Sequence, residues 1–152
     1  MSAPTVPDVA SLSGLEVMRL IAAGALPPPG IAVLLGMDIA EVTDGRVVFT
    51  LEPDERMLNA IGSVHGGIAA TLLDSAMGCA VHTTLPPGRG WTTAQLNLHY
   101  LRPMQPGMGT VRAVGTVLHS GRKQATAEAR LYDVQDRLLA HGTTTCLVLA
   151  QR

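Results

Sequence analysis

A histidine and two glycines stand directly before a long apolar stretch that contains a single carboxylate. His65-Gly66-Gly67 is followed by residues 68–81, where Asp74 is the only charged side chain. A helix without a polar face is normally buried, and an ionised carboxylate there must be paired, hydrogen-bonded or functional, because its desolvation is costly. Asp74 is therefore the leading candidate for a catalytic group, either as a nucleophile on an acyl carbon or as a general base.

The glycine pair allows a ligand to approach the backbone at the start of the predicted helix. The first turn of a helix has N–H groups without intrahelical acceptors and carries the positive end of the helix dipole. Such amides can stabilise an anion, or the oxyanion that a carbonyl develops during acyl transfer. Taken alone, a glycine pair such as Gly66-Gly67 is more often an ordinary tight turn into a helix.

The histidines offer fewer functional interpretations. Imidazole titrates near neutral pH, so His65 could act as a general base, but a histidine at a helix start more often serves as a cap. The other four are His82, His99, His119 and His141. They lack the spacing of metal ligands, and we expect no metal site. Ser75 has no G-x-S-x-G motif around it and projects about 100° away from Asp74, which disfavours a serine nucleophile.

Helical geometry separates the two leading candidates. Asp74 follows Gly66 by eight residues, or about 12 Å along a helix axis, whereas a nucleophile must lie within about 3.5 Å of the reacting carbon. Gly66 and Asp74 of one chain therefore cannot act on the same atom. Either they have unrelated roles, or a two-fold dimer shares each site, with Gly66 from one subunit and Asp74 from the other. We favour the shared site.

The flanking sequence predicts an α+β domain. Strands are expected at residues 37–42, 46–52, 92–101, 111–118, 124–132 and 138–148, and a helix over 66–82. Alternation in the third strand puts Leu96, Leu98 and Tyr100 on one face and Thr93, Gln95, Asn97 and His99 on the other. An antiparallel sheet packed on one buried helix satisfies this order of elements.

The N-terminal part reads as an addition to this domain. We divide the chain into residues 1–35, a tail with one short helix, and residues 36–150, the main domain. Within the first part, residues 1–10 read as a tail, and Ser13 and Glu16 have the spacing of a capping box that starts a helix ending near Gly24. Pro27–Gly30 reads as a stiff linker.

Composition limits the partners. The net charge of −1 and the 15% of charged residues disfavour nucleic acid or an anionic membrane surface as a partner. The apolar fraction of 47% favours an oligomer. Cys79 and Cys146 fit buried thiols in a reducing compartment. Since neither a signal peptide nor a spanning segment is visible, we expect a soluble, cytoplasmic protein.

Two motifs carry a resemblance to a known family. The first runs from Asn59 through His65-Gly66-Gly67 to Leu73-Asp74, and the second from Thr93 to Arg102-Pro103. Together they resemble the hotdog-fold acyl-CoA thioesterases over residues 36–148, above all the PaaI-type group, which includes phenylacetate-pathway and 4-hydroxybenzoyl-CoA thioesterases. This resemblance implies a curved antiparallel sheet around one long helix. It also implies dimers joined edge to edge, which commonly pair into homotetramers.

The resemblance assigns roles to five residues. The Gly66 N–H would polarise the thioester carbonyl, and Asp74 of the partner subunit would be the nucleophile or the general base. The Asn59 amide would orient the thioester or the attacking water, and Thr93 would help to place that water. His65 would mainly hold the loop together.

By the same resemblance, the chain hydrolyses an aryl- or medium-chain acyl-CoA to the free acid and CoA, with no separate cofactor. Arg102, Arg122 and Lys123 would bind the CoA phosphates, although solvated surface charges are the simple alternative. Two other functions stay open. A hotdog hydratase or dehydratase would need new roles for His65 and Asp74 and a second acid, and a non-catalytic acyl-CoA-binding regulator usually carries a DNA-binding segment. Residues 1–35 are neither basic nor similar to a helix-turn-helix, which favours the enzyme.

Overall fold

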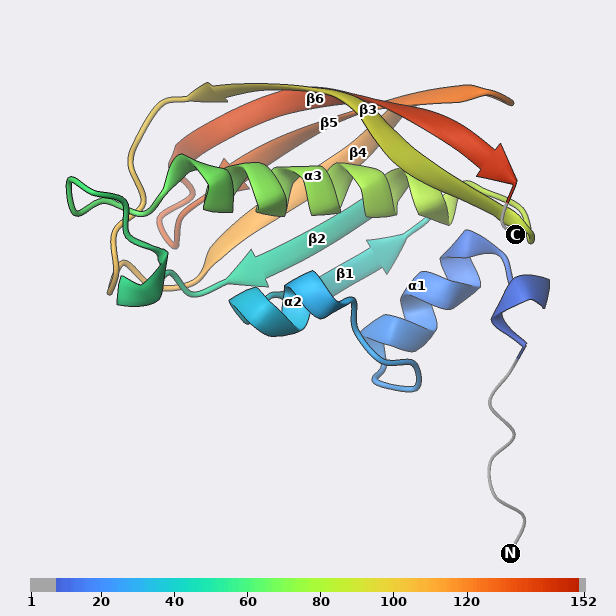
Figure 1. The fold of residues 1–152 in the computed structure, drawn as a ribbon, viewed down its shortest axis with the longest axis horizontal. Helices are drawn as coiled ribbons and strands as arrows, with labels where there is room; N and C mark the ends of the chain where they lie inside the picture. The colour runs from blue at the N-terminus through green and yellow to red at the C-terminus, as the bar shows by residue number, and fades with distance from the viewer. Residues whose placement is uncertain (1–7, 151–152) are drawn as a thin grey trace, which may run out of the picture.

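A curved antiparallel sheet surrounds one long helix in the computed structural model, which describes residues 8–150 (Figure 1). The strands are β1 Asp38–Thr43, β2 Arg46–Leu51, β3 Arg89–Tyr100, β4 Val111–Ser120, β5 Gln124–Tyr132 and β6 Leu138–Ala150. The α-helices are α1 Gly14–Ala22, α2 Gly30–Leu35 and α3 Gly66–Thr83, with single 3₁₀ turns at Val9–Ser11 and Glu55–Met57. The sheet order is β1-β2-β4-β5-β6-β3. The predicted α+β architecture is thus confirmed.

Helix α3 forms the centre of the core. Its buried residues are Ala69, Leu72, Leu73 and the continuous run from Ala76 to Thr83. One narrow face remains partly open and is formed by Gly67, Ala70, Thr71, Asp74 and Ser75. Asp74 is therefore half-buried on the single open face of the helix. No helix within residues 8–150 is both long and apolar enough to span a bilayer.

Strand β4 lies so close to α3 that only glycine fits at one contact point. A Cβ on Gly115 would overlap the backbone carbonyl of Ala76. The helix therefore lies directly on the sheet at this point, and its orientation relative to β4 is fixed by backbone contact as well as by side chains.

In the N-terminal segment, α1 packs against β1 and the C-terminal end of α3 (Figure 1). Ser13 and Glu16 form the predicted capping box, and Gly14 lies against the His82 carbonyl. The predicted linker leads directly into α2, which the sequence analysis missed and which ends at Gly36 in the left-handed conformation. Residues 1–7 of the predicted tail lie outside the described part of the chain.

Strand β3 is an edge strand of 12 residues that pairs only with β6. Its register shifts between Thr93 and Gln95, which leaves Ala94 as a bulge. A bulge reverses the face on which the following side chains lie. Thr93 consequently lies on the helix side with Leu96 and Tyr100, and the prediction that it lies on the opposite face is wrong, because simple alternation does not include the bulge.

Candidate active site

The first turn of α3 leaves one backbone donor free. His65 is the N-cap residue, and its Nδ1 accepts a hydrogen bond of 2.9 Å from the Gly67 N–H. The Ile68 N–H donates to the His65 carbonyl at 2.9 Å. Within residues 8–150, the Gly66 N–H makes no hydrogen bond. Gly66 is therefore the amide of this turn that is available to a ligand.

The capping role of His65 is confirmed by the same contact. Since Nδ1 accepts a hydrogen bond, the proton of the neutral imidazole lies on Nε2. The ring orientation is thus fixed by the backbone of the turn, in agreement with a residue that holds the loop together.

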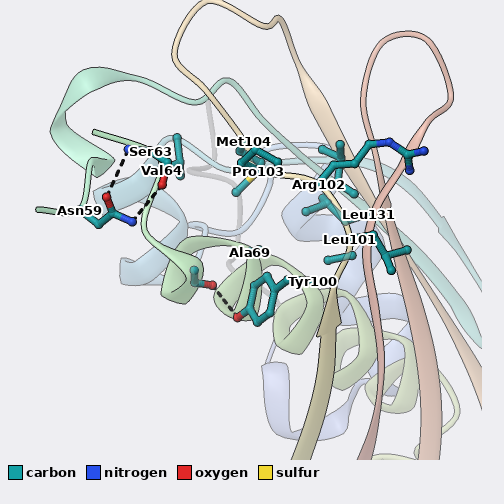
Figure 2. Close-up of a pocket in the computed structure, with 13 residues that line it drawn as sticks. Asn59, Ser63, Val64, Ala69, Tyr100, Leu101, Arg102, Pro103, Met104 and Leu131 are labelled. Carbon is teal, nitrogen blue, oxygen red and sulfur yellow. Dashed lines mark hydrogen bonds between the residues drawn. The ribbon is translucent and has the colours of Figure 1, made fainter. Parts of the chain in front are cut away.

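A pocket of about 320 Å³ opens beside Gly66 (Figure 2). Its walls include the apolar residues Val64, Ala69, Leu101, Met104, Leu131 and Leu139 and the polar residues Asn59, Ser63, Tyr100 and Arg102. A mainly apolar lining that includes several polar groups is typical of a small-molecule site.

Tyr100 is a site residue to which the sequence analysis gave no role. It ends β3, and its hydroxyl donates a hydrogen bond of 2.8 Å to the Gly66 carbonyl (Figure 2). Alternation along β3 places Tyr100 on the helix side, which was a usable signal. Its partner on α3 could not be identified without the packing of the strand against the helix.

Asn59 organises the loop before α3. Its Oδ1 accepts hydrogen bonds from the Ile61 and Ser63 amides, and its Nδ2 donates to Ser63 Oγ at 2.9 Å. The side chain lines the pocket and retains one amide proton that is not used in these contacts. The predicted contact with a thioester or a water therefore depends on that one proton.

Asp74 is held by Thr93. The Thr93 hydroxyl donates to Asp74 Oδ1 at 2.8 Å, across the contact between β3 and α3. Two buried thiols lie near this carboxylate: burial and the Asp74 charge raise the pKa of Cys79 to about 12, and burial raises the pKa of Cys146. Both thiols are therefore protonated at neutral pH.

The structure assembles the predicted residues into two groups rather than one. Gly66 is joined to Tyr100, and Asp74 is joined to Thr93. Because α3 is continuous from Gly66 to Thr83, the two groups stay about 12 Å apart along its axis. One protomer therefore presents two separate halves of a site.

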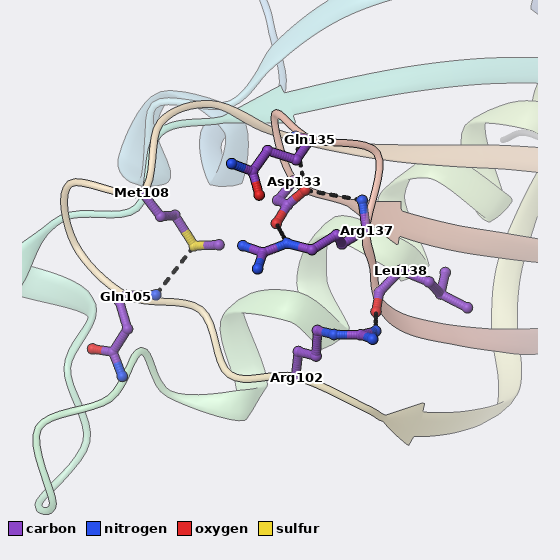
Figure 3. Close-up of polar contacts among 7 residues, drawn as sticks. All are labelled: Arg102, Gln105, Met108, Asp133, Gln135, Arg137 and Leu138. Atoms are coloured by element: carbon purple, nitrogen blue, oxygen red, sulfur yellow. Dashed lines mark hydrogen bonds and ion pairs between the residues drawn. The ribbon is translucent and has the colours of Figure 1, made fainter.

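The predicted phosphate-binding residues also lie in two places. Arg102 lines the pocket beside Gly66, and its guanidinium donates to the Leu138 carbonyl at 2.7 Å (Figure 3). The β5–β6 turn next to it is held by the buried Asp133, which accepts from Arg137. Arg122 and Lys123 lie between β4 and β5, near the other end of α3.

These three cationic residues take part in none of the ion pairs within residues 8–150. Their charges are available to an anionic ligand. Over the same residues, no three His, Cys, Asp or Glu side chains are grouped so that they could hold a metal ion.

Comparisons with known proteins agree on one family. The family described as the thioesterase superfamily matches residues 61–140, which is more than half of the chain. The Halobacterium salinarum protein named Putative esterase VNG_1336C is 34% identical over 75% of this chain and 77% of its own. The acyl-coenzyme A thioesterase PaaI of Escherichia coli is 28% identical, and the match covers 72% of this chain and 75% of that protein. The solved structure of the E. coli PaaI protein has a TM-score of 0.79 at 25% identity. The match covers 93% of this chain and 98% of that chain.

Proposed function

Since the chain belongs to the thioesterase superfamily and has the hotdog fold of the PaaI-type members, it is a thioester hydrolase, and we propose that it cleaves an aryl- or medium-chain acyl-CoA at a site shared by two subunits. The observation that carries this proposal is the single free amide of the α3 first turn. Gly66 lines the pocket, and its N–H makes no hydrogen bond within residues 8–150. A thioester carbonyl supplies the missing acceptor.

A dimer through β3 would complete the site. A 12-residue edge strand with free N–H and C=O groups is a ready surface for pairing with a second chain. Antiparallel pairing that brings Gly66 next to the partner's Asp74 requires a two-fold axis near Ala70. The same axis sets Tyr100 next to the partner's Thr93 and crosses β3 at Asn97, because the bulged Ala94 does not count in the pairing.

The open face of α3 supports this arrangement. Near the proposed axis it consists of small residues, Gly67, Ala70 and Thr71, which allow two helices to approach closely. The open face also extends to Asp74, so the carboxylate would point toward the other subunit. The composite site would occur twice in the dimer. A dimer of such dimers stays a prediction.

The reaction would proceed by attack on the thioester carbon. The carbonyl oxygen accepts from Gly66 N–H as it becomes negative. Asp74 of the partner takes the proton of a water whose oxygen bonds to the carbon, the C–S bond breaks, and the proton passes to the departing CoA thiolate. In the alternative route, the Asp74 carboxylate attacks the carbon, the C–S bond breaks and the CoA thiolate leaves. Water then hydrolyses the resulting anhydride to the free acid and the Asp74 carboxylate, and the proton that is released passes to the thiolate. In both routes Thr93 fixes the carboxylate.

The dimer would also unite the separated cationic residues. With this pairing of β3, the partner subunit's Arg102 lies opposite Trp91, close to the pocket that Arg89 and Arg122 line. Lys123 follows in the same turn. We propose that these side chains bind the CoA phosphates, with CoA as part of the substrate and no separate cofactor.

The test is hydrolysis of aryl-, short-, medium- and long-chain acyl-CoAs, measured as thiol release by the wild type and by Asp74→Ala and Asp74→Asn. We expect turnover of an aryl- or medium-chain substrate and a loss of about 10²–10⁴-fold in both variants. Absence of thiol release from every substrate would overturn the proposal. Equal rates in the variants would remove Asp74 from the mechanism. Enoyl-CoA absorbance, followed in separate samples that contain a 2-enoyl-CoA or a 3-hydroxyacyl-CoA, identifies a hydratase.

A further inference from the structure

The glycine pair at the start of α3 is held by side chains at three of its four polar backbone atoms. His65 accepts from the Gly67 N–H, Thr71 donates to the Gly67 carbonyl at 2.9 Å, and Tyr100 donates to the Gly66 carbonyl at 2.8 Å. The fourth atom is the free Gly66 N–H. The side chains thus surround the one amide that must stay available.

Tyr100 makes the contact from furthest away in the sequence. His65 and Thr71 belong to the turn itself, whereas Tyr100 reaches it from the end of β3, 34 residues later. A Cβ placed on Gly66 would lie 3.5 Å from the Tyr100 ring, so the ring covers the side of Gly66 where another residue would carry its side chain. The strand thereby fixes the turn relative to the sheet.

Glycine needs such support more than other residues. Two consecutive glycines have the largest conformational freedom of any dipeptide, and ordering them costs the most entropy. The direction of the Gly66 N–H depends on the backbone dihedrals around it. A hydroxyl on its carbonyl and a ring against its Cα restrict those dihedrals at the same residue.

We propose that Tyr100 is a positioning residue for the oxyanion donor. Its hydroxyl holds the Gly66 carbonyl and thereby fixes the orientation of this residue, so that the Gly66 N–H points at the thioester carbonyl. This inference rests on the proposed function. Tyr100 acts through Gly66, so its contribution appears when charge develops on the carbonyl oxygen. The affinity for the substrate in the ground state depends little on the Tyr100 hydroxyl.

Kinetics of Tyr100→Phe test this role, because the substitution removes the hydroxyl and keeps the ring. We expect kcat to fall about tenfold or more, less than the 10²–10³-fold of deleting an oxyanion donor, with KM and Tm close to the wild-type values. Tyr132→Phe is the matched control, since Tyr132 is the second tyrosine of the chain and packs against Arg112. We expect wild-type kinetics for that control.

NMR of the free protein gives a readout that does not depend on turnover. With ¹⁵N-glycine labelling, Tyr100→Phe should shift the Gly66 and Gly67 amide signals and lower their order parameters, while Tyr132→Phe leaves them unchanged. Unchanged glycine signals in Tyr100→Phe would overturn the proposal, as would an unchanged kcat in an active enzyme. A wild type without hydrolysis would instead overturn the proposed function together with this role, and the two failures are thereby distinguishable.

Discussion

Thr93 Oγ1 donates a hydrogen bond to Asp74 Oδ1 at 2.8 Å, and the bulge at Ala94 is what puts Thr93 on the helix side of β3. A hydrogen bond to a charged group is worth about 1.5–3 kcal/mol, more than a neutral one. The contact therefore determines where the half-buried carboxylate points.

Replacing Thr93 should separate the hydroxyl from the shape of the side chain. Thr93→Val removes the donor at nearly constant volume, and we expect kcat to fall roughly ten- to a hundredfold, in line with the loss of a charge-assisted hydrogen bond. Thr93→Ser keeps the donor and should stay near the wild type. Steady-state thiol release measures both. Wild-type activity in Thr93→Val would show that the contact has no part in turnover.

Mixed dimers should reveal the shared site. Gly66→Pro removes the oxyanion donor and Asp74→Ala removes the carboxylate, so each homodimer should be inactive. A heterodimer of the two variants has one intact composite site of two and should recover about half of the wild-type activity. Differently tagged subunits, purified as heterodimers, provide the measurement. Inactive heterodimers would mean that each subunit works alone or that the subunits pair differently.

The stability of the protein should fall in mild acid because of His82. This side chain is buried beside the Trp91 ring, and burial lowers its pKa below the ordinary value of 6.5. The unfolded chain therefore binds a proton that the folded chain does not. The free energy of unfolding should decline from about pH 6.5 down to the folded pKa and be unaffected by His82 above that range.

Urea unfolding of His82→Phe between about pH 5 and pH 8 tests whether His82 causes this decline in the free energy of unfolding. Phenylalanine keeps the ring contact and cannot bind a proton. The variant should show a flatter pH dependence than the wild type. His119→Gln, a change at an exposed histidine, serves as the control and should keep the wild-type slope.

Gly115→Ala should destabilise the fold by about 1–3 kcal/mol or more, since its Cβ would overlap the Ala76 carbonyl and force β4 away from α3. Gly30→Ala is the matched comparison, because no atom lies within 4 Å of its added Cβ. At a helix position this second change should be neutral or stabilise by up to about 1 kcal/mol. The urea concentration at the midpoint of unfolding measures the change in stability of both variants. Equal midpoints would contradict the close backbone contact.

Local signals predicted most of the elements that position the site. Each of these signals depends on residues that are close together in the sequence. They are the capping spacing of Ser13 and Glu16, the apolar run of α3 and the alternation of the later strands. Such signals are readable in one sequence. The position of His65 as a helix cap follows from the same local chemistry.

The features that the sequence did not predict depend on contacts between distant segments. The bulge at Ala94 moves Thr93 to the other face of β3, and alternation alone gives no sign of it. The Tyr100 contact with Gly66 needs the packing of β3 on α3. Helix α2 follows three prolines, which obscured its start at Gly30. The sequence predicted unpaired N–H groups at the start of the helix, but not that the His65 imidazole accepts from one of them, the Gly67 N–H.

Helix α3 carries Gly66 at its first turn and Asp74 eight residues later on one continuous element. In the proposed dimer, each copy of this helix therefore serves both sites, as the oxyanion donor of one and the carboxylate bearer of the other. A rigid helix transmits a small axial displacement along its whole length. A ligand that displaces the helix at one site would therefore also displace a residue of the other site, and substrate saturation curves of the dimer test whether the two sites are coupled.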